Sequence, residues 1–378
     1  MSQKRNILVV NWNDRTNPWA GGAEIHLHDI FSRIAARGHR VTLLCSGYGD
    51  APAEDALDGM RIVRVGGRYT FNFVLPRVLA RRFRGERFDC VVEALNKIPL
   101  CTPLFARAPV LGIGHHLFGT TIFREVPPPL SLYVYLSELA VPWVYRRVTM
   151  EVISQSTRED FVQRGLAPDR IRVVYVGMDP AEYSPGPPEV KTEAPTFLAL
   201  GRIRKYKGLD LVVDAVAQLA RNGHPEIRLV VAGSGNYLEP LKAHVRQTGA
   251  EGLVTFAGRV SEEDKVHLYR SAWALIMTSP KEGWGLTCLE AQACGTPVIA
   301  SDSPGLREAV RNEESGLLVP HADRPALAAA MRRFLEDRAL RARLTDGALR
   351  FAGTFSWDRA ADETMALIEE AIAEREDA

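Results

Sequence analysis

The chain has 378 residues, of which 46% are hydrophobic and 25% are charged, a composition typical of folded globular proteins that excludes disordered and fibrous ones. This length is sufficient for two domains that each bury a core of their own. Because 47 basic and 46 acidic residues give a formal net charge of only +1, we expect no nucleic acid among its partners.

The cysteines and the apolar segments indicate a cytoplasmic protein. Five dispersed cysteines without a C-x-x-C pair suit a reducing compartment and argue against disulfides and structural zinc; they are Cys45, Cys90, Cys101, Cys288 and Cys294. The start, MSQKRNILVV, lacks the cleavage pattern of a signal peptide. The most apolar long stretch, residues 129–144, is interrupted by Glu138 and Pro142 and is too short to cross a bilayer.

The first 178 residues alternate short β-branched runs with helical patterns. Strands are predicted at residues 7–10, 41–44, 62–65, 90–92, 110–113, 152–153 and 171–176. Between the first two strands, apolar residues recur at helical spacing from Leu27 to Ile34. This alternation, with nearly continuous apolar strands, indicates a parallel sheet covered by helices on both faces in a Rossmann-like layout.

A proline-rich segment separates the two halves of the chain. Residues 179–195 contain five prolines in 17 positions, which disfavours helix and central strand and supports a surface linker. We therefore place an N-terminal domain at residues 1–180 and a C-terminal domain at residues 181–356. The second domain repeats the alternation, with a helix from Gly208 and strands predicted at residues 197–200, 227–231, 254–256, 275–277 and 298–300. A last helix is predicted at residues 358–373.

Ligands of open parallel sheets bind at the carboxyl ends of the strands, so the turns that follow the strands are candidate sites. The first such turn contains Gly21-Gly22-Ala23-Glu24 at the entrance of a helix. Paired glycines there allow close backbone approach and leave amide donors for phosphate or sugar hydroxyls. A plain tight turn is the alternative, and the full G-x-G-x-x-G pattern of a dinucleotide fold is absent.

The second turn, GRIRKYKG at residues 201–208, lies between a strand and a helix. Its four cations lie beside the positive end of the helix and repel one another unless an anion neutralises them. A diphosphate held by Arg202 and Lys207 would do so, with roughly 1.5 to 3 kcal/mol from each charge-assisted hydrogen bond. The alternative is a solvated basic loop.

The third turn, within residues 279–301, combines two carboxylates with a glycine-rich helix entrance. Glu282 precedes a predicted short helix and Glu290 lies eight residues later inside it. The pair could flank a ligand that rests on the free amides of Gly285, Leu286 and Thr287. Carboxylates suit hydroxyls and amides suit phosphate oxygens, so the two groups would recognise different ends of one molecule. A solvated Glu290 is the alternative.

These strings, with FAGRVSEEDKVHLYRSAWALIMTSPKEGWGLTCLEAQACGTPVIASDSPGLREAV and SGLLVP, make residues 196–320 similar to the donor half of family 4 retaining glycosyltransferases. The resemblance implies the GT-B fold, an α/β fold in which two Rossmann-like domains with parallel sheets face each other across a cleft. It implies a sugar nucleotide on the C-terminal domain and an acceptor on the N-terminal one. It also implies that the last helix, placed within residues 357–378, crosses back to the first domain.

The resemblance assigns roles position by position. Arg202 and Lys207 match the cations that bind the diphosphate, Glu282 matches the glutamate that contacts the transferred sugar, and Glu290 matches the one that holds the ribose. The amides near Gly285, Leu286 and Thr287 would meet the diphosphate, Gly22 would also face the donor, and Gly258, Arg259 and Val260 would line the base pocket. The string APVLGIGHHLF resembles the strand end that carries an active-site histidine, where the register favours His115 over His116.

The same resemblance implies retention at the anomeric carbon. No carboxylate of the N-terminal domain can be assigned as a nucleophile, so the sequence favours a front-face reaction in which fixed donors stabilise the departing diphosphate. We expect no metal and no cofactor, the sugar nucleotide being a substrate, and leave its base open between uracil and guanine. A GT-B-fold sugar-nucleotide epimerase and a non-catalytic sugar-binding protein are the alternatives.

The hydroxyl acceptor is less defined and could be a growing polysaccharide, a glycolipid or a small molecule. Residues 61–87 carry eight arginines and one acid, and residues 130–147 are apolar and aromatic with a basic end. Together these segments could dock on an anionic lipid surface and take a lipid-linked acceptor, which would make the protein peripheral on the cytoplasmic face of a membrane. A solvated arginine face and a buried helix are the alternative.

Overall fold

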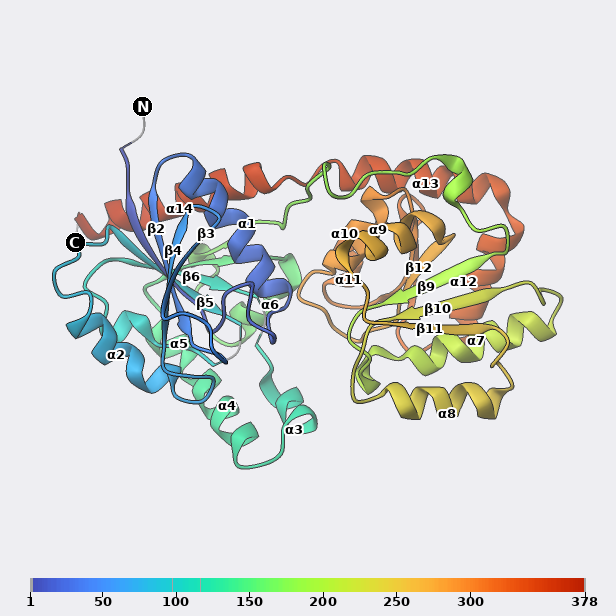
Figure 1. The fold of residues 1–378 in the computed structure, drawn as a ribbon, viewed down its shortest axis with the longest axis horizontal. Helices are drawn as coiled ribbons and strands as arrows, with labels where there is room; N and C mark the ends of the chain where they lie inside the picture. The colour runs from blue at the N-terminus through green and yellow to red at the C-terminus, as the bar shows by residue number, and fades with distance from the viewer. Residues whose placement is uncertain (1–2, 97, 116, 377–378) are drawn as a thin grey trace. The chain divides into compact units, whose positions relative to one another are not determined.

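A computed structural model describes residues 3–96, 98–115 and 117–376. The chain forms two compact units, one made of Met1–Gly177 with Trp357–Ala378 and the other of Met178–Ser356 (Figure 1). The chain thus divides at Gly177, where the proline-rich segment had suggested residue 180. Each unit is a sheet of mainly parallel strands between helices, so the predicted α/β class is confirmed.

The sheet of unit 1 has eight strands in the order β3-β4-β2-β1-β5-β6-β7-β8. The strands are β1 (Asn6–Val10), β2 (Arg40–Ser46), β3 (Glu54–Leu57), β4 (Met60–Val65), β5 (Cys90–Leu95), β6 (Val110–Gly114), β7 (Thr149–Val152) and β8 (Ile171–Val173). Every pairing is parallel, as predicted, except that of β3 with β4, an antiparallel edge strand that was not predicted. Asp58 and Gly59 both have positive φ and form the two-residue turn of a hairpin. The polar, exposed β3 carries no apolar run that would predict it.

The helices of unit 1 cover both faces of this sheet. They are α1 (Gly22–Ala36), α2 (Phe71–Arg81), α3 (Ile122–Glu125), α4 (Leu130–Leu139), α5 (Val141–Val144), α6 (Gln155–Gln163) and α14 (Trp357–Glu376). The predicted stripe from Leu27 to Ile34 is the buried face of α1. The last helix, α14, packs on α1 and is tied to unit 1 by ion pairs such as Arg5–Glu369, at 2.6 Å. Among the described residues, no helix has both the length and the apolarity that crossing a bilayer requires.

The sheet of unit 2 has six parallel strands in the order β11-β10-β9-β12-β13-β14. They are β9 (Thr196–Leu200), β10 (Arg228–Ala232), β11 (Val254–Gly258), β12 (Ala274–Met277), β13 (Val298–Asp302) and β14 (Gly316–Pro320). The edge strand β14 was not predicted. Its position against β13 requires glycine at 316, because a Cβ there would overlap the carbonyl oxygen of Val298.

Helices flank the sheet of unit 2 as well, and all its strands end at one edge. The helices are α7 (Leu209–Arg221), α8 (Leu238–Thr248), α9 (Glu262–Ser271), α10 (Leu286–Ala293), α11 (Leu306–Ala309), α12 (Arg324–Glu336) and α13 (Arg338–Ala352). Ser261, Asp323 and Asp337 cap three of them by accepting backbone N–H bonds. The alternation read from the sequence therefore places the turns after β9, β10, β11 and β12 at the carboxyl edge, where ligands of such sheets bind.

Candidate active site

The turn between β9 and α7 presents two of the predicted cations. Gly201 and Gly208 both have positive φ, which a residue with a side chain rarely adopts, and Gly208 caps α7. Arg202 follows Gly201 and is exposed, whereas Lys207 is mostly buried. The Lys207 ammonium forms an ion pair with the Glu282 carboxylate. The carboxylate after β12 thus supplies an anion to Lys207 in this structure, and the predicted diphosphate contact stays a prediction.

The turn after β12 is built to hold Glu282 against Lys207. Thr278 donates its hydroxyl to the carbonyl oxygens of Lys207, at 2.6 Å, and Gly208, at 3.1 Å. The amide of Glu282 donates to the carbonyl of Pro304 at 3.0 Å. Gly305, with φ 83°, lies so close that a Cβ would overlap the Glu282 carbonyl. Backbone contacts from two other strand ends therefore fix the ion pair in place.

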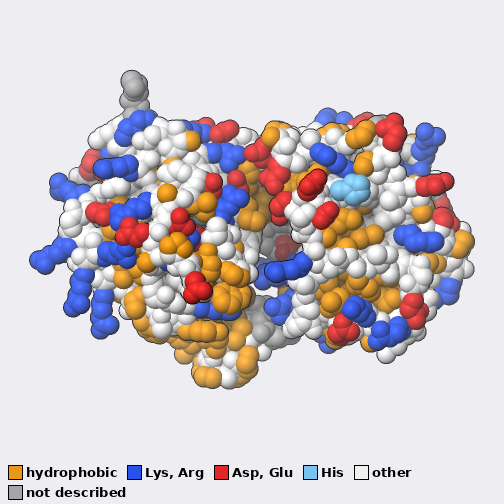
Figure 2. All heavy atoms as spheres, viewed as in Figure 1, with side chains coloured by type: hydrophobic (Ala, Val, Ile, Leu, Met, Phe, Trp, Pro, Cys, Tyr) orange, Lys and Arg blue, Asp and Glu red, His pale blue; other side chains and the backbone are white. Residues whose placement is uncertain are grey.

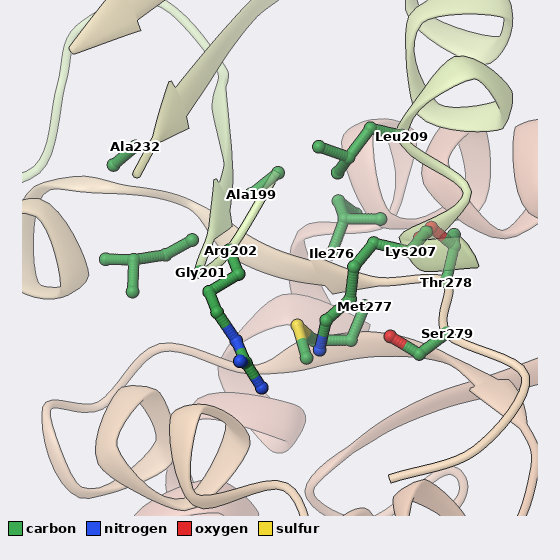
Figure 3. A pocket seen from close by; sticks show the side chains of 11 residues that line it. Ala199, Gly201, Arg202, Lys207, Leu209, Ala232, Ile276, Met277, Thr278 and Ser279 are labelled. Atoms are coloured by element: carbon green, nitrogen blue, oxygen red, sulfur yellow. The ribbon is translucent and has the colours of Figure 1, made fainter. Parts of the chain in front are cut away.

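A small hollow lies at this edge of the sheet, lined by the ends of β9, β10 and β12. Figure 3 shows the Arg202 and Lys207 side chains reaching toward the same side of it, with Met277 between them. Gly233, after β10, was not singled out from the sequence, although a Cβ there would overlap the carbonyl oxygen of Gly201. The Gly-Ser-Gly string at residues 233–235, directly after a predicted strand, was the signal available.

Helix α10 points its amino end to the same edge of unit 2. Gly285 caps it with φ 107°, and the described residues offer no acceptor to the amides of Leu286 and Thr287. These amides and the positive end of the helix form a site suited to an anion. Trp284, next to the cap, is buried and packs against Phe355 with ring centroids 5.4 Å apart.

Glu290 lies inside α10 and is mostly buried, which argues against the alternative of a solvated side chain. Its carboxylate accepts a hydrogen bond from the Tyr269 hydroxyl at 2.6 Å and lies 3.4 Å from the Lys265 ammonium. Burial opposes the charge of Lys265, but Glu290 and Glu262 outweigh it and raise the pKa of the lysine. Both glutamates of the Glu-x7-Glu spacing are thus paired with lysines.

The residues predicted for the base pocket lie at and after the end of β11, the edge strand next to β10. Gly258 ends this strand with φ 69°, and its carbonyl accepts the amide of Gly233 at 2.6 Å. Arg259 is exposed and Val260 is partly buried. These three residues therefore share the carboxyl edge with Arg202.

In unit 1, the glycine pair lies at the start of α1. Gly22 is the first residue of the helix, and the amide of Gly21 donates to the Glu24 carboxylate at 2.8 Å. The other Glu24 oxygen accepts from the Asn13 side chain at 2.9 Å. The prediction that both glycine amides face a ligand is thus wrong for Gly21, because its own helix satisfies this donor.

His115 directly follows β6 and is buried. Its Nε2 lies 3.2 Å from Nδ1 of His26 on α1, and the two rings meet edge to face. Burial lowers the pKa of His26 to about 4, so this ring is neutral at neutral pH. Trp357, the first residue of α14, packs on the other side of His26 at 5.7 Å between centroids. No motif or spacing in the sequence pointed to His26. His116 lies outside the described residues.

Two family models match the chain in succession. The model described as Glycosyltransferase Family 4 matches residues 20–182, and that described as Glycosyl transferases group 1 matches residues 184–350. The chain belongs to glycosyltransferase family 4. The resemblance read from its motifs is therefore confirmed.

Relatives and solved structures agree with this family 4 membership. A D-inositol 3-phosphate glycosyltransferase of Acidothermus cellulolyticus is 38% identical over 56% of this chain and 50% of its own length. The chain thus spans about half the length of such curated relatives. Sucrose-phosphate synthase of Thermosynechococcus elongatus, at 21% identity, covers 98% of this chain and 100% of its own with a TM-score of 0.83. Anabaena HepE in complex with UDP-glucose, at 18% identity, covers 98% of this chain and 100% of its own with a TM-score of 0.77. The fold is GT-B.

Within this family 4 chain, the predicted residues fall into two groups. One edge of unit 2 brings together those taken as contacts of the sugar nucleotide, namely Arg202, Lys207, Gly258, Arg259, Val260, Glu282, Gly285, Leu286, Thr287 and Glu290. Gly22 and His115 belong to unit 1.

Proposed function

We propose that this protein is a retaining glycosyltransferase that moves a sugar from a nucleoside diphosphate to a hydroxyl acceptor by a metal-independent front-face reaction. The observation that carries the proposal is the Lys207–Glu282 ion pair beside Arg202 and the amino end of α10. In this arrangement a cation and a carboxylate that suit different parts of one donor neutralise each other before the donor binds.

Donor binding would exchange the partners of this ion pair. The diphosphate takes the place of the Glu282 carboxylate at Lys207, and the freed carboxylate accepts hydrogen bonds from the hydroxyls of the sugar. Each charge-assisted hydrogen bond contributes about 1.5 to 3 kcal/mol, so the exchange costs little of the binding free energy. Glu290, which contacts Tyr269 and Lys265, would accept hydrogen bonds from the ribose hydroxyls.

The carboxylates of unit 1 support the front-face reaction. A double displacement needs a carboxylate free to attack the sugar, but three of the buried carboxylates described in unit 1 are already engaged by neighbouring groups. Asp14 pairs with Arg64, Glu24 caps α1, and Glu93 accepts bonds from Thr102. In the proposed route the acceptor hydroxyl attacks on the side from which the diphosphate leaves, and a phosphate oxygen takes the proton.

Charge that develops on the leaving diphosphate would be stabilised by groups already fixed in place. The interactions of the diphosphate with Arg202, Lys207 and the amides of Leu286 and Thr287 become more favourable as the glycosidic bond breaks. Together they supply the positive charge that a divalent cation provides elsewhere. His115, whose Nε2 lies 3.2 Å from Nδ1 of His26, would contact the sugar through its ring or its carbonyl oxygen.

Donor and acceptor classes follow from the relatives only as proposals. The Anabaena structure was solved with UDP-glucose, which favours a UDP-sugar over a GDP-sugar in the first assays. The curated relatives are named for D-inositol 3-phosphate, so a phosphorylated polyol joins glycans and glycolipids as an acceptor to test. A cytoplasmic location fits the five free cysteines, which suit a reducing compartment.

The test is a thermal-shift and turnover screen against UDP-, GDP- and ADP-sugars, with and without EDTA. We expect one donor to raise the unfolding temperature, and nucleotide release from it to accelerate when the acceptor is added, in EDTA as well as in magnesium. Release of free sugar at full rate without an acceptor would instead indicate the epimerase. Loss of turnover in EDTA that magnesium restores would overturn the metal-independent reaction.

A further inference from the structure

Helix α4 buries the polar side chains of Ser131 and Glu138, whereas α4 and α5 leave several large apolar side chains exposed. The buried positions run along one stripe and include Ser131 and Glu138. The opposite stripe consists of Leu132, Leu136, Leu139 and Trp143, which are 49%, 54%, 51% and 78% exposed. An ordinary surface helix shows the reverse pattern. The alternative of a buried helix for this segment therefore does not hold for its outer face.

Glu138 fixes this orientation. Its carboxylate accepts the backbone amides of Phe118 and Gly119, both at 2.7 Å, and lies 3.3 Å from the Arg164 guanidinium. Turning the helix to bury its leucines would remove these partners and leave two amides without acceptors. The exposed apolar stripe is thus a consequence of strong internal bonds and not of loose packing.

Helix α2 extends the apolar surface. Phe73, 64% exposed, stacks on Tyr133 with ring centroids 6.4 Å apart, and Asn72 donates to the Tyr133 hydroxyl. We call the set formed by these helices the α2–α5 surface; its apolar members are Phe73, Leu132, Tyr133, Leu136, Leu139 and Trp143. Figure 2 shows hydrophobic side chains gathered over this end of unit 1, with Lys and Arg atoms at its outer edge.

Arginines border the α2–α5 surface. Arg77 and Arg81 on α2, Arg84 after it, and Arg146 and Arg147 after α5 are exposed. None of the carboxylates in the described ranges lies within ion-pair distance of these five. The eight arginines of residues 61–87 do not form one basic face, because three of them, Arg61, Arg64 and Arg82, form ion pairs with acidic residues. The five exposed arginines thus lie on or directly after helices of the α2–α5 surface without an ion pair to a described carboxylate.

We infer that the α2–α5 surface docks on an anionic lipid bilayer, with α4 and α5 lying in the interface. This inference rests on the proposed function and deepens it, because it makes the acceptor hydroxyl part of a lipid-borne molecule. Leucine and tryptophan side chains enter the boundary between headgroups and acyl chains, and the arginines meet the lipid phosphates. A second copy of the chain fits less well, because a two-fold contact would bring two arginine borders together.

The experiment is vesicle flotation of the whole chain. Wild type should float with vesicles of phosphatidylcholine and phosphatidylglycerol at low salt, and much less with phosphatidylcholine alone or at high salt. The double variant Leu136→Ser/Trp143→Ser should lower the bound fraction about tenfold or more. Leu136→Phe/Trp143→Phe, which stays apolar, should float like wild type.

A charge series tests the arginine border separately. Arg77→Glu/Arg81→Glu/Arg84→Glu should lower binding to anionic vesicles about tenfold or more. Arg246→Glu/Arg332→Glu/Arg350→Glu changes the net charge equally on exposed positions of unit 2 and should bind like wild type. Equal binding by all variants, or no flotation of wild type at low salt, would overturn the inference. So would a wild-type dimer that the serine variant dissociates, without vesicle binding by either.

The two proposals fail in different assays. Donor-induced thermal shift and nucleotide release in detergent solution report on unit 2 and should be the same in Leu136→Ser/Trp143→Ser as in wild type. Vesicle binding without a donor effect would leave the docking surface standing and refute the transferase. A donor effect without vesicle binding would refute the docking surface alone.

Discussion

The two glutamates at the site of unit 2 and the buried Glu93 of unit 1 are accommodated in different ways. At the site of unit 2, Glu282 and Glu290 face the ammonium groups of Lys207 and Lys265. In unit 1, Glu93 accepts bonds from Thr102 and Tyr145, and burial raises its pKa although these hydroxyls oppose the shift. Ion pairs near a surface can exchange one partner for a ligand, whereas carboxyls sealed among hydroxyls and amides cannot. The difference indicates that Glu282 and Glu290 can exchange a partner for a ligand, whereas Glu93 holds the loop that contains Thr102.

The largest effect should come from removing the exchanging cation. We expect Lys207→Ala to lower turnover about 100-fold or more, because it removes a fixed donor from the leaving diphosphate. The free energy of unfolding should fall by about 1 kcal/mol or less, because the ion pair is near the surface. Steady-state kinetics and urea unfolding measure the two quantities.

The neighbouring Lys205 provides the matched control for this variant. It is exposed and belongs to the same short turn, η5 (Lys205–Lys207), but does not line the hollow. Lys205→Ala should therefore keep turnover near that of wild type. Equal turnover for both variants would show that Lys207 does not act on the diphosphate.

How far the sequence predicts this molecule depends on the distance between partners. Contiguous residues form the apolar strands, the apolar stripe of α1 and the cation-bearing turn after β9. The structure contains all three as predicted. The partner of Lys207 lies far along the chain, and the His26–His115 pair joins a helix to a strand end. Such pairs depend on strand order, which local periodicity does not contain. The polar edge strand β3 was missed because it is exposed and has no apolar run, and an apolar run is the main sequence signal of a strand.

A smaller effect is expected where the backbone turns of unit 2 touch. Gly233, with φ 131°, lies against the carbonyl of Gly201, so Gly233→Ala must displace the turn that carries Arg202. We expect a loss of about 1 to 3 kcal/mol in the free energy of unfolding and weaker donor binding. Urea unfolding and donor titration measure these changes. Gly252→Ala, where nothing lies near the added Cβ, is the control and should change neither.

In unit 1, the free energy of unfolding should depend on pH through Glu151 of β7. Burial raises the pKa of this carboxyl from 4.5 to about 8, against the opposing effect of the Thr364 hydroxyl on α14. Because the folded pKa exceeds the unfolded one, its stability contribution is full below pH 4.5 and is lost as pH rises through about 8.

The free energy of unfolding should thus fall by about 1 kcal/mol for each pH unit between the two pKa values. Glu151→Gln, which stays neutral, should flatten this dependence, as urea unfolding across the neutral range would show. An unchanged slope in the variant would mean that Glu151 is ionised in the folded protein.

The smallest effect should come from the glycine pair of unit 1, although its sequence is as glycine-rich as the turns of unit 2. Gly21 has an extended backbone with φ −149°, which any residue adopts, and the nearest atom to an added Cβ is a Glu24 oxygen at 3.8 Å. We expect Gly21→Ala to change the free energy of unfolding by less than about 0.5 kcal/mol and to leave the cap of α1 intact. A loss of turnover without a loss of stability would show instead that a ligand approaches this backbone closely, as the sequence suggested, and would make the start of α1 part of the reaction site.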